Sequence, residues 1–431
     1  MDHGGRHAVR LELIPLADAV LPLIRSTSRD LWRYSAANDQ GHRMHDGVDL
    51  LERAVDDPAA LEAQGIQTPT PQQVYTVVHK ALASSIRVIA RADDSSGVIG
   101  DACRRLIDLH PRAAAQAGVS RAKLADWVYE FHVDGEVDYF VLDPVAYAPA
   151  LGDEGLRRLR GRIDALRAQI APADPNDRFP RLDHRELVVQ WFDKRFAVLD
   201  RDIEAIIRTH LKDGHVAAWH EDVAEAMEEI GEIDLAIGWA ERASLFDRGH
   251  QSQRAAERWW RLLGEHRPLE LRAAARTILE RWPSAGSGAR LVAVAGDGVV
   301  DDVQTTLESR PAELVRFQLD TMRNPALAWG TAHRLALSDD WVWADLARAY
   351  LPLDPVAAIE VQVRLVAASL QVADTRRYRP AARELVNIRR SAIAAAETAA
   401  LTVVDGAISD LRERYRRRPS LIDALDRANL P

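Results

Sequence analysis

A short helical pattern that recurs along residues 224–307 constrains this 431-residue chain more than any other feature. Gly231 follows one amphipathic segment, Gly264 stands thirty-three residues later, and Gly296 belongs to a weaker third copy. A glycine-centred turn that returns every 30–34 residues is typical of stacked helical hairpins of the tetratricopeptide kind. Such hairpins bury their apolar faces only against neighbouring hairpins. We therefore expect an all-α fold: a tetratricopeptide-like helical-hairpin solenoid preceded by an N-terminal helical domain.

Helical signals also fill the first part of the chain. Apolar residues spaced three and four apart follow Thr70 and Pro71, a capping hydroxyl with a proline in the first turn. The next predicted helix ends at Pro111, because proline disfavours further helix, and another opens at Ser120. Both faces of residues 137–142 are largely apolar, so this segment is predicted to be an irregular connector that could be extended.

The main boundary is predicted at a proline-rich stretch. Three prolines and several polar residues cannot continue a helix, so residues 171–183 are expected to link an N-terminal domain, 1–170, to the solenoid, 184–431. Within the solenoid, helices are predicted at about 184–212, 216–230 and 234–246. Nine of the eleven tryptophans lie between Trp191 and Trp343, which suits the core between stacked hairpins. Asn324-Pro325 and Asp354-Pro355 are predicted to begin two later helices.

Composition excludes several classes of protein. The formal net charge of −9 argues against general coating of nucleic acid, which needs a basic footprint. No segment has the eighteen or more apolar residues of a membrane span, and the first residues do not resemble a secretion signal. A cytoplasmic location is therefore expected. The lone cysteine, Cys103, excludes an internal disulfide and a zinc site of several cysteines, and burial as a small apolar residue is favoured over a reactive thiolate.

Several short phrases occur in a characteristic order along the sequence. They are Ile99-Gly100-Asp101, Leu124-Ala125-Asp126-Trp127, Leu151-Gly152-Asp153-Glu154-Gly155-Leu156, Glu229-Ile230-Gly231-Glu232, Asp354-Pro355 and Tyr415-Arg416-Arg417-Arg418-Pro419-Ser420-Leu421. This series resembles an uncharacterised bacterial helical family that is associated with SWIM-type zinc-finger proteins. The resemblance covers roughly residues 75–427 and implies a helical fold without an assigned activity. Because a SWIM finger needs several cysteines, no zinc ligand is carried over.

Two groups of side chains are candidates for chemistry. His210, His215 and His220 could bind zinc, but their five-residue spacing separates them around a helix, which favours solvated loop and cap positions. Asp126 and Glu130 share one helix face and could act as general acid and base, yet a solvent-facing pair is favoured. His132 should point away from both acids.

Other motifs indicate turns and caps. The pairs Asp56-Asp57, Asp93-Asp94 and Asp301-Asp302 flank predicted helices, where acids cap N-termini or occupy turns. Neither a phosphate-binding loop nor a nucleophile elbow is present in the sequence. No catalytic residue, cofactor or metal ligand is predicted.

The strongest binding signal is an arginine cluster near the end of the sequence. Eleven arginines against five acids lie between Arg376 and Arg418. Arginine suits phosphate and carboxylate, but a solvated terminal helix whose cations offset the dipole near its C-terminal end is favoured. The alternative, a predicted binding surface, consists of Arg412, Arg414, Arg416, Arg417 and Arg418.

Three functions remain open from the sequence. The favoured one is a non-enzymatic helical-repeat scaffold that mediates protein–protein interaction, with an unidentified protein partner. The first alternative is a nucleic-acid-associated protein that uses the arginine cluster. The second is an enzyme with an unrecognised site.

Overall fold

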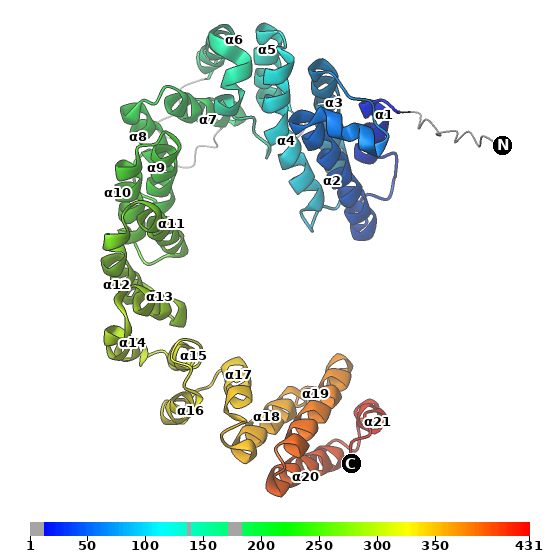
Figure 1. Ribbon diagram of the computed structural model, residues 1–431, viewed down its shortest axis with the longest axis vertical. Helices are drawn as coiled ribbons and strands as arrows, with labels where there is room; N and C mark the ends of the chain where they lie inside the picture. The colour runs from blue at the N-terminus through cyan, green and yellow to red at the C-terminus, as the bar shows by residue number, and fades with distance from the viewer. Residues whose placement is uncertain (1–12, 136–138, 171–182) are drawn as a thin grey trace, which may run out of the picture. The chain divides into compact units, whose positions relative to one another are not determined.

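The computed structural model describes residues 13–135, 139–170 and 183–431. Within these ranges the chain is helical, with no strand and a single isolated bridge between Ile14 and Ile66, which confirms the all-α prediction (Figure 1). No described helix combines the length and the apolar character needed to cross a bilayer. Most of the predicted linker, residues 171–182, lies outside the described residues, and so do residues 136–138 of the predicted connector. Residues 139–142 form no helix or strand.

The chain divides into two compact units. Unit 1 contains residues 1–215 and 222–232, and unit 2 contains residues 216–221 and 233–431. Helix α9 (Ala217–Glu229) contributes residues to both. The other helices of unit 1 are α1 (Leu16–Ile24), α2 (Tyr34–Asp56), the short 3-10 helix η1 (Pro58–Gln64), α3 (Pro71–Ile89), α4 (Val98–Ala117), α5 (Arg121–Val133), α6 (Pro144–Arg167), α7 (His184–Leu199) and α8 (Ile203–Leu211).

Local capping and an apolar stripe explain α3. The Thr70 hydroxyl accepts a hydrogen bond from the Gln73 backbone N–H while the Gln73 side chain returns to the Thr70 N–H, a complete capping box. Val74, Val78 and Leu82 then bury one face of the helix. Helix α3 packs on α4, so this face becomes part of the core of unit 1.

Two predicted helix ends in unit 1 are wrong. Helix α4 continues through Pro111 to Ala117, because the buried residues Ala113 and Ala114 keep this turn in the core. Conversely, the predicted helix at 184–212 is broken. Arg201 has a left-handed backbone with φ of 55°, and the Asp202 side chain caps the new helix α8 by accepting from the Ala205 N–H.

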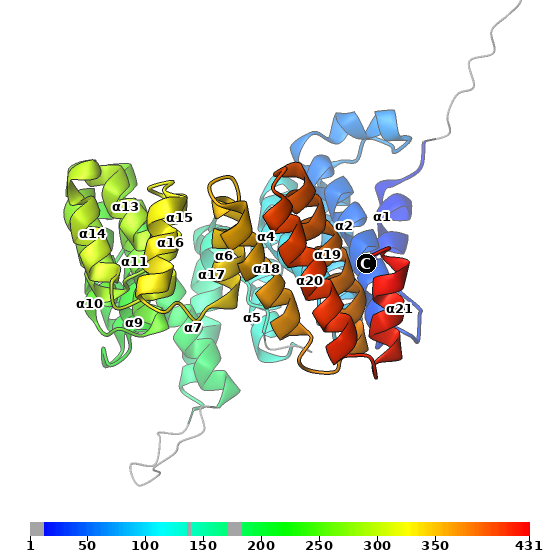
Figure 2. The same cartoon turned by 90° about the horizontal axis from the view of Figure 1, so that it is seen from below.

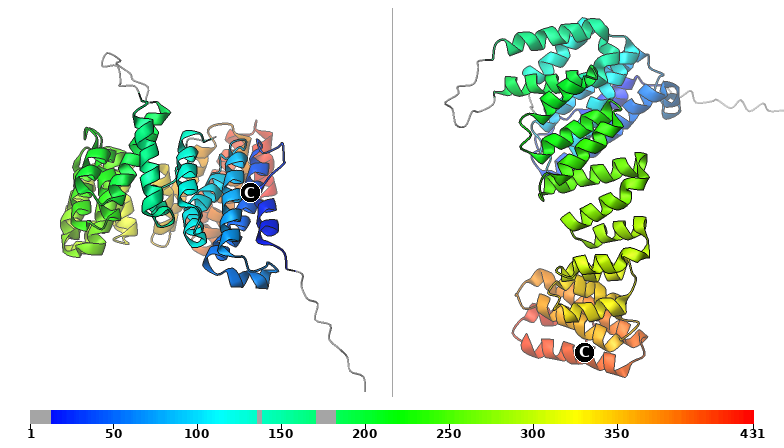
Figure 3. Two further views of the ribbon diagram at one scale, coloured as in Figure 1. Left: turned by 90° about the horizontal axis from the view of Figure 1, so that it is seen from above. Right: turned by 90° about the vertical axis from the view of Figure 1, so that its left-hand side faces the viewer.

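Unit 2 is a succession of short helices, each packed on the next from α10 to α20, while α21 packs on α19 (Figure 3). Its helices are α10 (Ile233–Leu245), α11 (His250–His266), η2 (Pro268–Glu270), α12 (Leu271–Arg281), α13 (Ala285–Ala295), η3 (Asp297–Val299), α14 (Val300–Leu307), α15 (Pro311–Asp320), α16 (Pro325–Arg334), α17 (Asp340–Tyr350), α18 (Pro355–Ser369), α19 (Thr375–Ala394), α20 (Thr398–Arg414) and α21 (Pro419–Arg427). The predicted starts at Pro325 and Pro355 are confirmed. Asn324 and Asp354 cap these helices with their side chains.

The glycine pattern predicts two of its three turns correctly. Gly231 and Gly296 adopt positive φ, 79° and 78°, where a side chain would strain the backbone. Gly264 instead lies inside α11. The turn comes three residues later, at Arg267, because Pro268 disfavours helical geometry in the residue before it.

The tryptophans are only partly in the core. Trp343 is 4% exposed, and its indole N–H donates to the Leu337 carbonyl oxygen at 2.7 Å, which helps to close the turn before α17. Trp341, two residues away on the same helix, is 82% exposed. The enrichment therefore fills interhelical gaps at some positions and leaves a large ring in solvent at another.

Four helices form the last core of unit 2. Helices α18, α19, α20 and α21 enclose a cluster of buried apolar residues (Figure 2). Tyr378 and Leu385 from α19 meet Leu421 and Leu425 from α21 in this cluster. Helix α19 packs on α21, so their solvent-facing sides adjoin, and four arginines line the surface between them.

Candidate functional site

The five arginines of the predicted surface have different roles. Arg412 is a structural residue: its Nε donates to the Pro431 carbonyl oxygen at 2.7 Å, and a second nitrogen donates to the Leu430 carbonyl oxygen at 2.9 Å. A third nitrogen lies 2.7 Å from the Asp426 carboxylate. Every side of this guanidinium is therefore used to hold the last residues against α20.

Arg418 closes the end of another helix. Its guanidinium donates to the carbonyl oxygens of Leu370 and Gln371, at 2.6 and 3.2 Å, and lies 4.2 Å from the centre of the Tyr415 ring. These carbonyls follow α18, where backbone acceptors lack helical partners and a cation is favourable. Arg412 and Arg418 are thus not the free binding groups that the sequence predicted.

The remaining three arginines are exposed. Arg414 ends α20, and Arg416 and Arg417 lie in the turn before α21. Within the described residues, none of these side chains takes part in an ion pair or a hydrogen bond. They remain available to a ligand.

A groove of about 780 Å³ lies between α19 and α21. Arg376, Arg379 and Arg383 line it from α19, and Arg427 lines it from α21. The three arginines of α19 are spaced three and four residues apart, which places them on one helix face. We call this groove, which these four arginines line, the arginine groove.

Two of the four groove arginines already have carboxylate partners. Arg376 Nε lies 3.1 Å from Asp374, and its hydrogen bond lowers the pKa of that carboxyl. Arg427 pairs with Asp423 at 2.9 Å, one turn earlier on α21. Arg379 and Arg383 are exposed and have no partner among the described residues. Two guanidinium groups in the arginine groove therefore keep all their donors for a ligand.

The groove also stands in a locally basic part of an acidic protein. Residues 374–431 contain twelve arginines, no lysine and eight acids, whereas the whole chain has 56 basic and 65 acidic residues. Sequence reasoning counted this excess but selected the adjacent arginines at 412–418. The helical spacing of Arg376, Arg379 and Arg383 was the signal that could have identified the groove.

The three histidines of the predicted group differ in burial and in contacts. His210 is 5% exposed, and its Nδ1 lies 3.0 Å from the Ile206 carbonyl oxygen. Burial, followed by the Lys194 charge, lowers the pKa of His210 to about 4. His215 is exposed, and His220 is half-buried with its ring 5.7 Å from that of Trp239. The expectation of a solvated position is therefore wrong for His210, because α8 turns this side chain inward.

The predicted acid pair belongs to a cluster of ion pairs. Two nitrogens of Arg158 donate to the two Asp126 carboxylate oxygens, each at 2.8 Å, and Arg162 donates to Asp126 at 2.9 Å. The hydrogen bond from Arg158 lowers the pKa of Asp126. Arg162 also reaches Glu130, at 3.5 Å. These contacts join α5 to α6 and hold Asp126 ionised, which does not suit a general acid.

His132 is buried on the opposite side of the same helix. Its Nε2 lies 3.0 Å from both the backbone nitrogen and the backbone oxygen of Leu142. Burial lowers the pKa of His132 to about 4. The imidazole therefore anchors the segment before α6 and does not approach Asp126.

Cys103 and the acidic pairs have structural positions. Cys103 is fully buried, and burial raises the pKa of its thiol to about 11, so the thiolate is disfavoured at neutral pH. Asp94 accepts hydrogen bonds from the backbone N–H groups of Ile99 and Gly100, each at 2.8 Å, at the start of α4. In the described part of the chain, no three His, Cys, Asp or Glu side chains gather as a metal site.

A buried chain of hydrogen bonds in unit 1 escaped sequence reasoning. His110 Nε2 lies 3.0 Å from His79 Nδ1, and His110 Nδ1 lies 2.9 Å from the Tyr147 hydroxyl. Burial, followed by the His79 charge, lowers the pKa of His110 to about 3. Trp127 stacks on His110, with ring centres 4.5 Å apart. A neutral imidazole can donate at one nitrogen and accept at the other, so the chain is satisfied in either direction.

The hydrogen-bonded side chains of His79, His110 and Tyr147 are closed to substrates. His110 and Tyr147 are 0% and 1% exposed, and only His79 is half-buried. No atom of His110 or Tyr147 can meet a reacting group from solvent. The three side chains instead connect α3, α4 and α6.

Comparison with known proteins gives one result. Residues 51–261 match the model of DUF6880, a family of unknown function. The match includes α3 to α10 and therefore the His79–His110–Tyr147 chain, but it ends before the arginine groove. No curated protein and no solved structure matches the chain.

Proposed function

We propose that this protein is a non-enzymatic, tetratricopeptide-like scaffold of the cytoplasm that binds a protein partner through an acidic segment held in the arginine groove. The observation that supports this proposal is the pair Arg379 and Arg383, whose guanidiniums have no partner among the described residues, in a groove of about 780 Å³. The association with SWIM-type zinc-finger proteins in bacteria stays a prediction.

The chemistry of the groove suits carboxylates. A guanidinium offers two parallel N–H donors that match the two oxygens of a carboxylate. Side chains three or four residues apart on a helix stand about 5–6 Å from each other. Alternate side chains of an extended segment are separated by roughly 6.5 Å. An extended acidic segment along α19 can therefore engage Arg379 and Arg383 with two successive carboxylates of one face.

Nucleic acid is the second candidate, and it fits the groove less well. Single-stranded nucleic acid is usually bound with aromatic side chains on which bases stack. Tyr378 is the aromatic residue that lines this groove, and it is only 4% exposed. The observation in favour of nucleic acid is the exposed set Arg414, Arg416 and Arg417 outside the groove.

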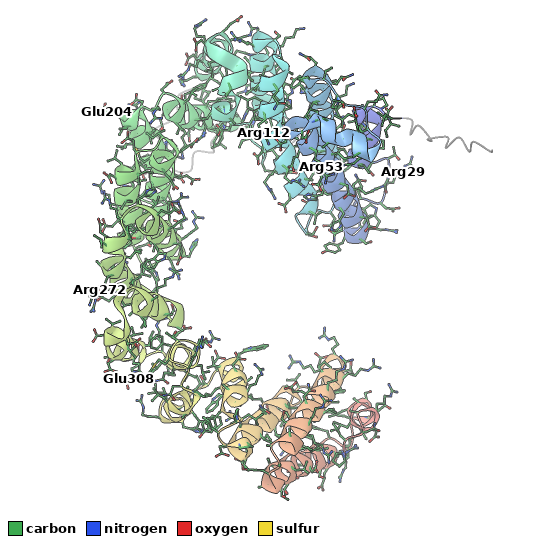
Figure 4. The ribbon with its side chains drawn as sticks, in the orientation of Figure 1. Arg29, Arg53, Arg112, Glu204, Arg272 and Glu308 are labelled. Carbon is green, nitrogen blue, oxygen red and sulfur yellow. The ribbon has the colours of Figure 1, made fainter. Side chains whose placement is uncertain are left out.

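Binding of a defined acidic probe tests the proposal. A fluorescent peptide of about ten residues with glutamate at alternate positions is titrated with the full chain, and its anisotropy is measured. We expect R379Q/R383Q to weaken binding at least tenfold. The matched control is R272Q/R390Q, which removes the same charge from α12, where Arg272 is labelled in Figure 4, and from the far part of α19.

The two candidate functions give different results. Equal binding by R379Q/R383Q and by R272Q/R390Q would contradict a specific groove. Single-stranded oligothymidylate that binds more tightly than the acidic peptide, and loses affinity in R414Q/R416Q/R417Q, would favour nucleic acid. Its affinity should then fall steeply with salt, because each phosphate contact releases a counterion.

A further inference from the structure

A second groove lies in unit 2 between α14, α15 and α16, and its volume is about 640 Å³. Asp301 and Gln304 line it from α14, Gln318 from α15, and Thr331 from α16. Glu308, which follows α14 and is labelled in Figure 4, also lines it. We call it the amide groove, because the carboxamides of Gln304 and Gln318 line it.

Gln318 is a buried polar side chain with an unused acceptor. It is 2% exposed, and its Nε2 donates to Gln304 Oε1 at 2.9 Å. Its own Oε1 is buried and has no hydrogen-bond partner in the described part of the chain. A buried carbonyl oxygen without a donor is unfavourable, so native proteins rarely retain one without a reason.

The orientation of the two carboxamides follows from a neighbouring acid. Gln304 Nε2 faces the Asp301 carboxylate at 3.4 Å. Turning both amides by 180° would preserve the contact between them but would place Gln304 Oε1 against the Asp301 oxygen, acceptor against acceptor. Asp301 therefore fixes the orientation of both carboxamides, and this orientation leaves the Oε1 atom of Gln318 without a donor among the described residues.

Several groups of the groove can still accept a hydrogen bond. Arg334 donates to Glu308 at 2.7 Å, and both amide nitrogens are directed at oxygens. Thr331 is 4% exposed, and its hydroxyl has no hydrogen bond among the described residues. The groups of the described residues that can still accept are therefore the Gln318 oxygen, the second oxygen of the Asp301 carboxylate and the Thr331 hydroxyl, one from each helix.

The wall formed by α16 leaves room for a ligand. A Cβ added at Gly330 would meet no atom within 4 Å, and Ala326 contributes only a methyl group. The site is thus open, acceptor-rich and negatively charged by one unit, with Asp301 and Glu308 against Arg334.

We propose that the amide groove binds a guanidinium side chain, the arginine of a protein partner. A guanidinium has five N–H donors in a plane and accepts nothing, which complements a groove whose unused groups accept. Its charge complements the Asp301 carboxylate. This inference is independent of the arginine groove and does not rest on the proposed function.

The probe is a fluorescent peptide of about ten residues with alternating glycine and arginine, compared with the same peptide containing citrulline, the neutral analogue of arginine. We expect the arginine peptide to bind at least tenfold more tightly. Q318L and D301N should each weaken its binding tenfold or more. The controls are Q253L and D410N, exposed positions elsewhere in unit 2, which should change affinity less than twofold.

Stability provides a second readout for Gln318. Because Q318L removes an unpaired buried oxygen, its midpoint of thermal unfolding should equal or exceed that of the unsubstituted chain while binding is lost. Retained affinity in D301N, equal binding of the citrulline peptide, or a lower midpoint in Q318L with unchanged binding would each overturn the proposal. Asp301 is exposed, so D301N tests the groove even where Q318L fails to fold.

Discussion

Both units consist of α-helices, but they differ in which polar side chains they bury and which they leave at the surface. Unit 1 buries imidazoles: His110, His132 and His210 are each less than 9% exposed. Unit 2 has no buried histidine among its described residues, and it instead carries guanidiniums and carboxamides at two open grooves. The difference lies in which kind of polar side chain each unit removes from water.

Protonation chemistry explains the contrast. A histidine can lose its charge at neutral pH, so burial costs little once its nitrogens are hydrogen-bonded. Arginine stays charged at any ordinary pH and must remain near water or an anion. A helix surface rich in arginine therefore stays open, whereas one that contains histidine can close into a core.

The largest expected effect is that of acid, which should destabilise unit 1 more than unit 2. The pKa values of the three histidines are about 3, 4 and 4 in the folded chain, below the ordinary value of 6.5. The unfolded chain therefore binds more protons below pH 6.5, and stability falls as pH falls from 6.5 toward 4. At pH 5 each of the three histidines should cost unit 1 about 2 kcal/mol, or about 6 kcal/mol in total.

Hydrogen exchange resolved by residue, at pH 7 and pH 5, measures this difference. Protection should fall in α3 to α8 and be retained in α12 to α21. An equal loss in both units would contradict the comparison, and so would a stability of unit 1 that does not change above pH 5.

Tyr147→Phe should have the next largest effect. It removes the hydroxyl that partners His110 Nδ1, 2.9 Å away, inside a fully buried site. Leaving one buried nitrogen unpaired costs about 1–3 kcal/mol. Urea denaturation should show this loss in unit 1 alone, while Tyr34→Phe, at a side chain that is 54% exposed, should leave the free energy of unfolding unchanged.

The smallest expected effect is a difference in stability between substitutions of two arginines of unit 2. Arg412→Gln should destabilise the α20–α21 end by about 1–2 kcal/mol, because three of its contacts hold the last residues. Arg414→Gln should stay within about 0.5 kcal/mol, as is usual for exposed positions. Chemical denaturation of both variants checks this, and equal effects would show that the contacts of Arg412 do not matter to stability.

Much of the fold could be predicted because its signals are local. The Thr70 cap and the proline starts at Pro325 and Pro355 act over four residues, and each is found where it was expected. Local rules failed where packing dominates. Pro111 does not end α4, because its turn is buried in the core, and Gly264 lies within a helix.

The sites required contacts that no local rule contains. His79 and Tyr147 meet His110 from positions 31 and 37 residues away, and Arg418 reaches Leu370 across 48 residues. Five neighbouring arginines looked alike in the sequence, yet packing made two of them structural. Gln304 and Gln318 carried no signal, because a glutamine becomes informative only when burial removes its water.

The sequence by itself determined that this chain is helical, where several of its helices begin, and that its last residues are rich in arginine. These properties depend on capping, proline geometry and composition, which act within a few residues. Only the tertiary structure decided which arginines line a groove, which histidines lose their charge and which carboxamide keeps an unpaired oxygen. The reason is physical: the cost of burying a polar group depends on what packs around it, and that is set by helices far apart in the chain.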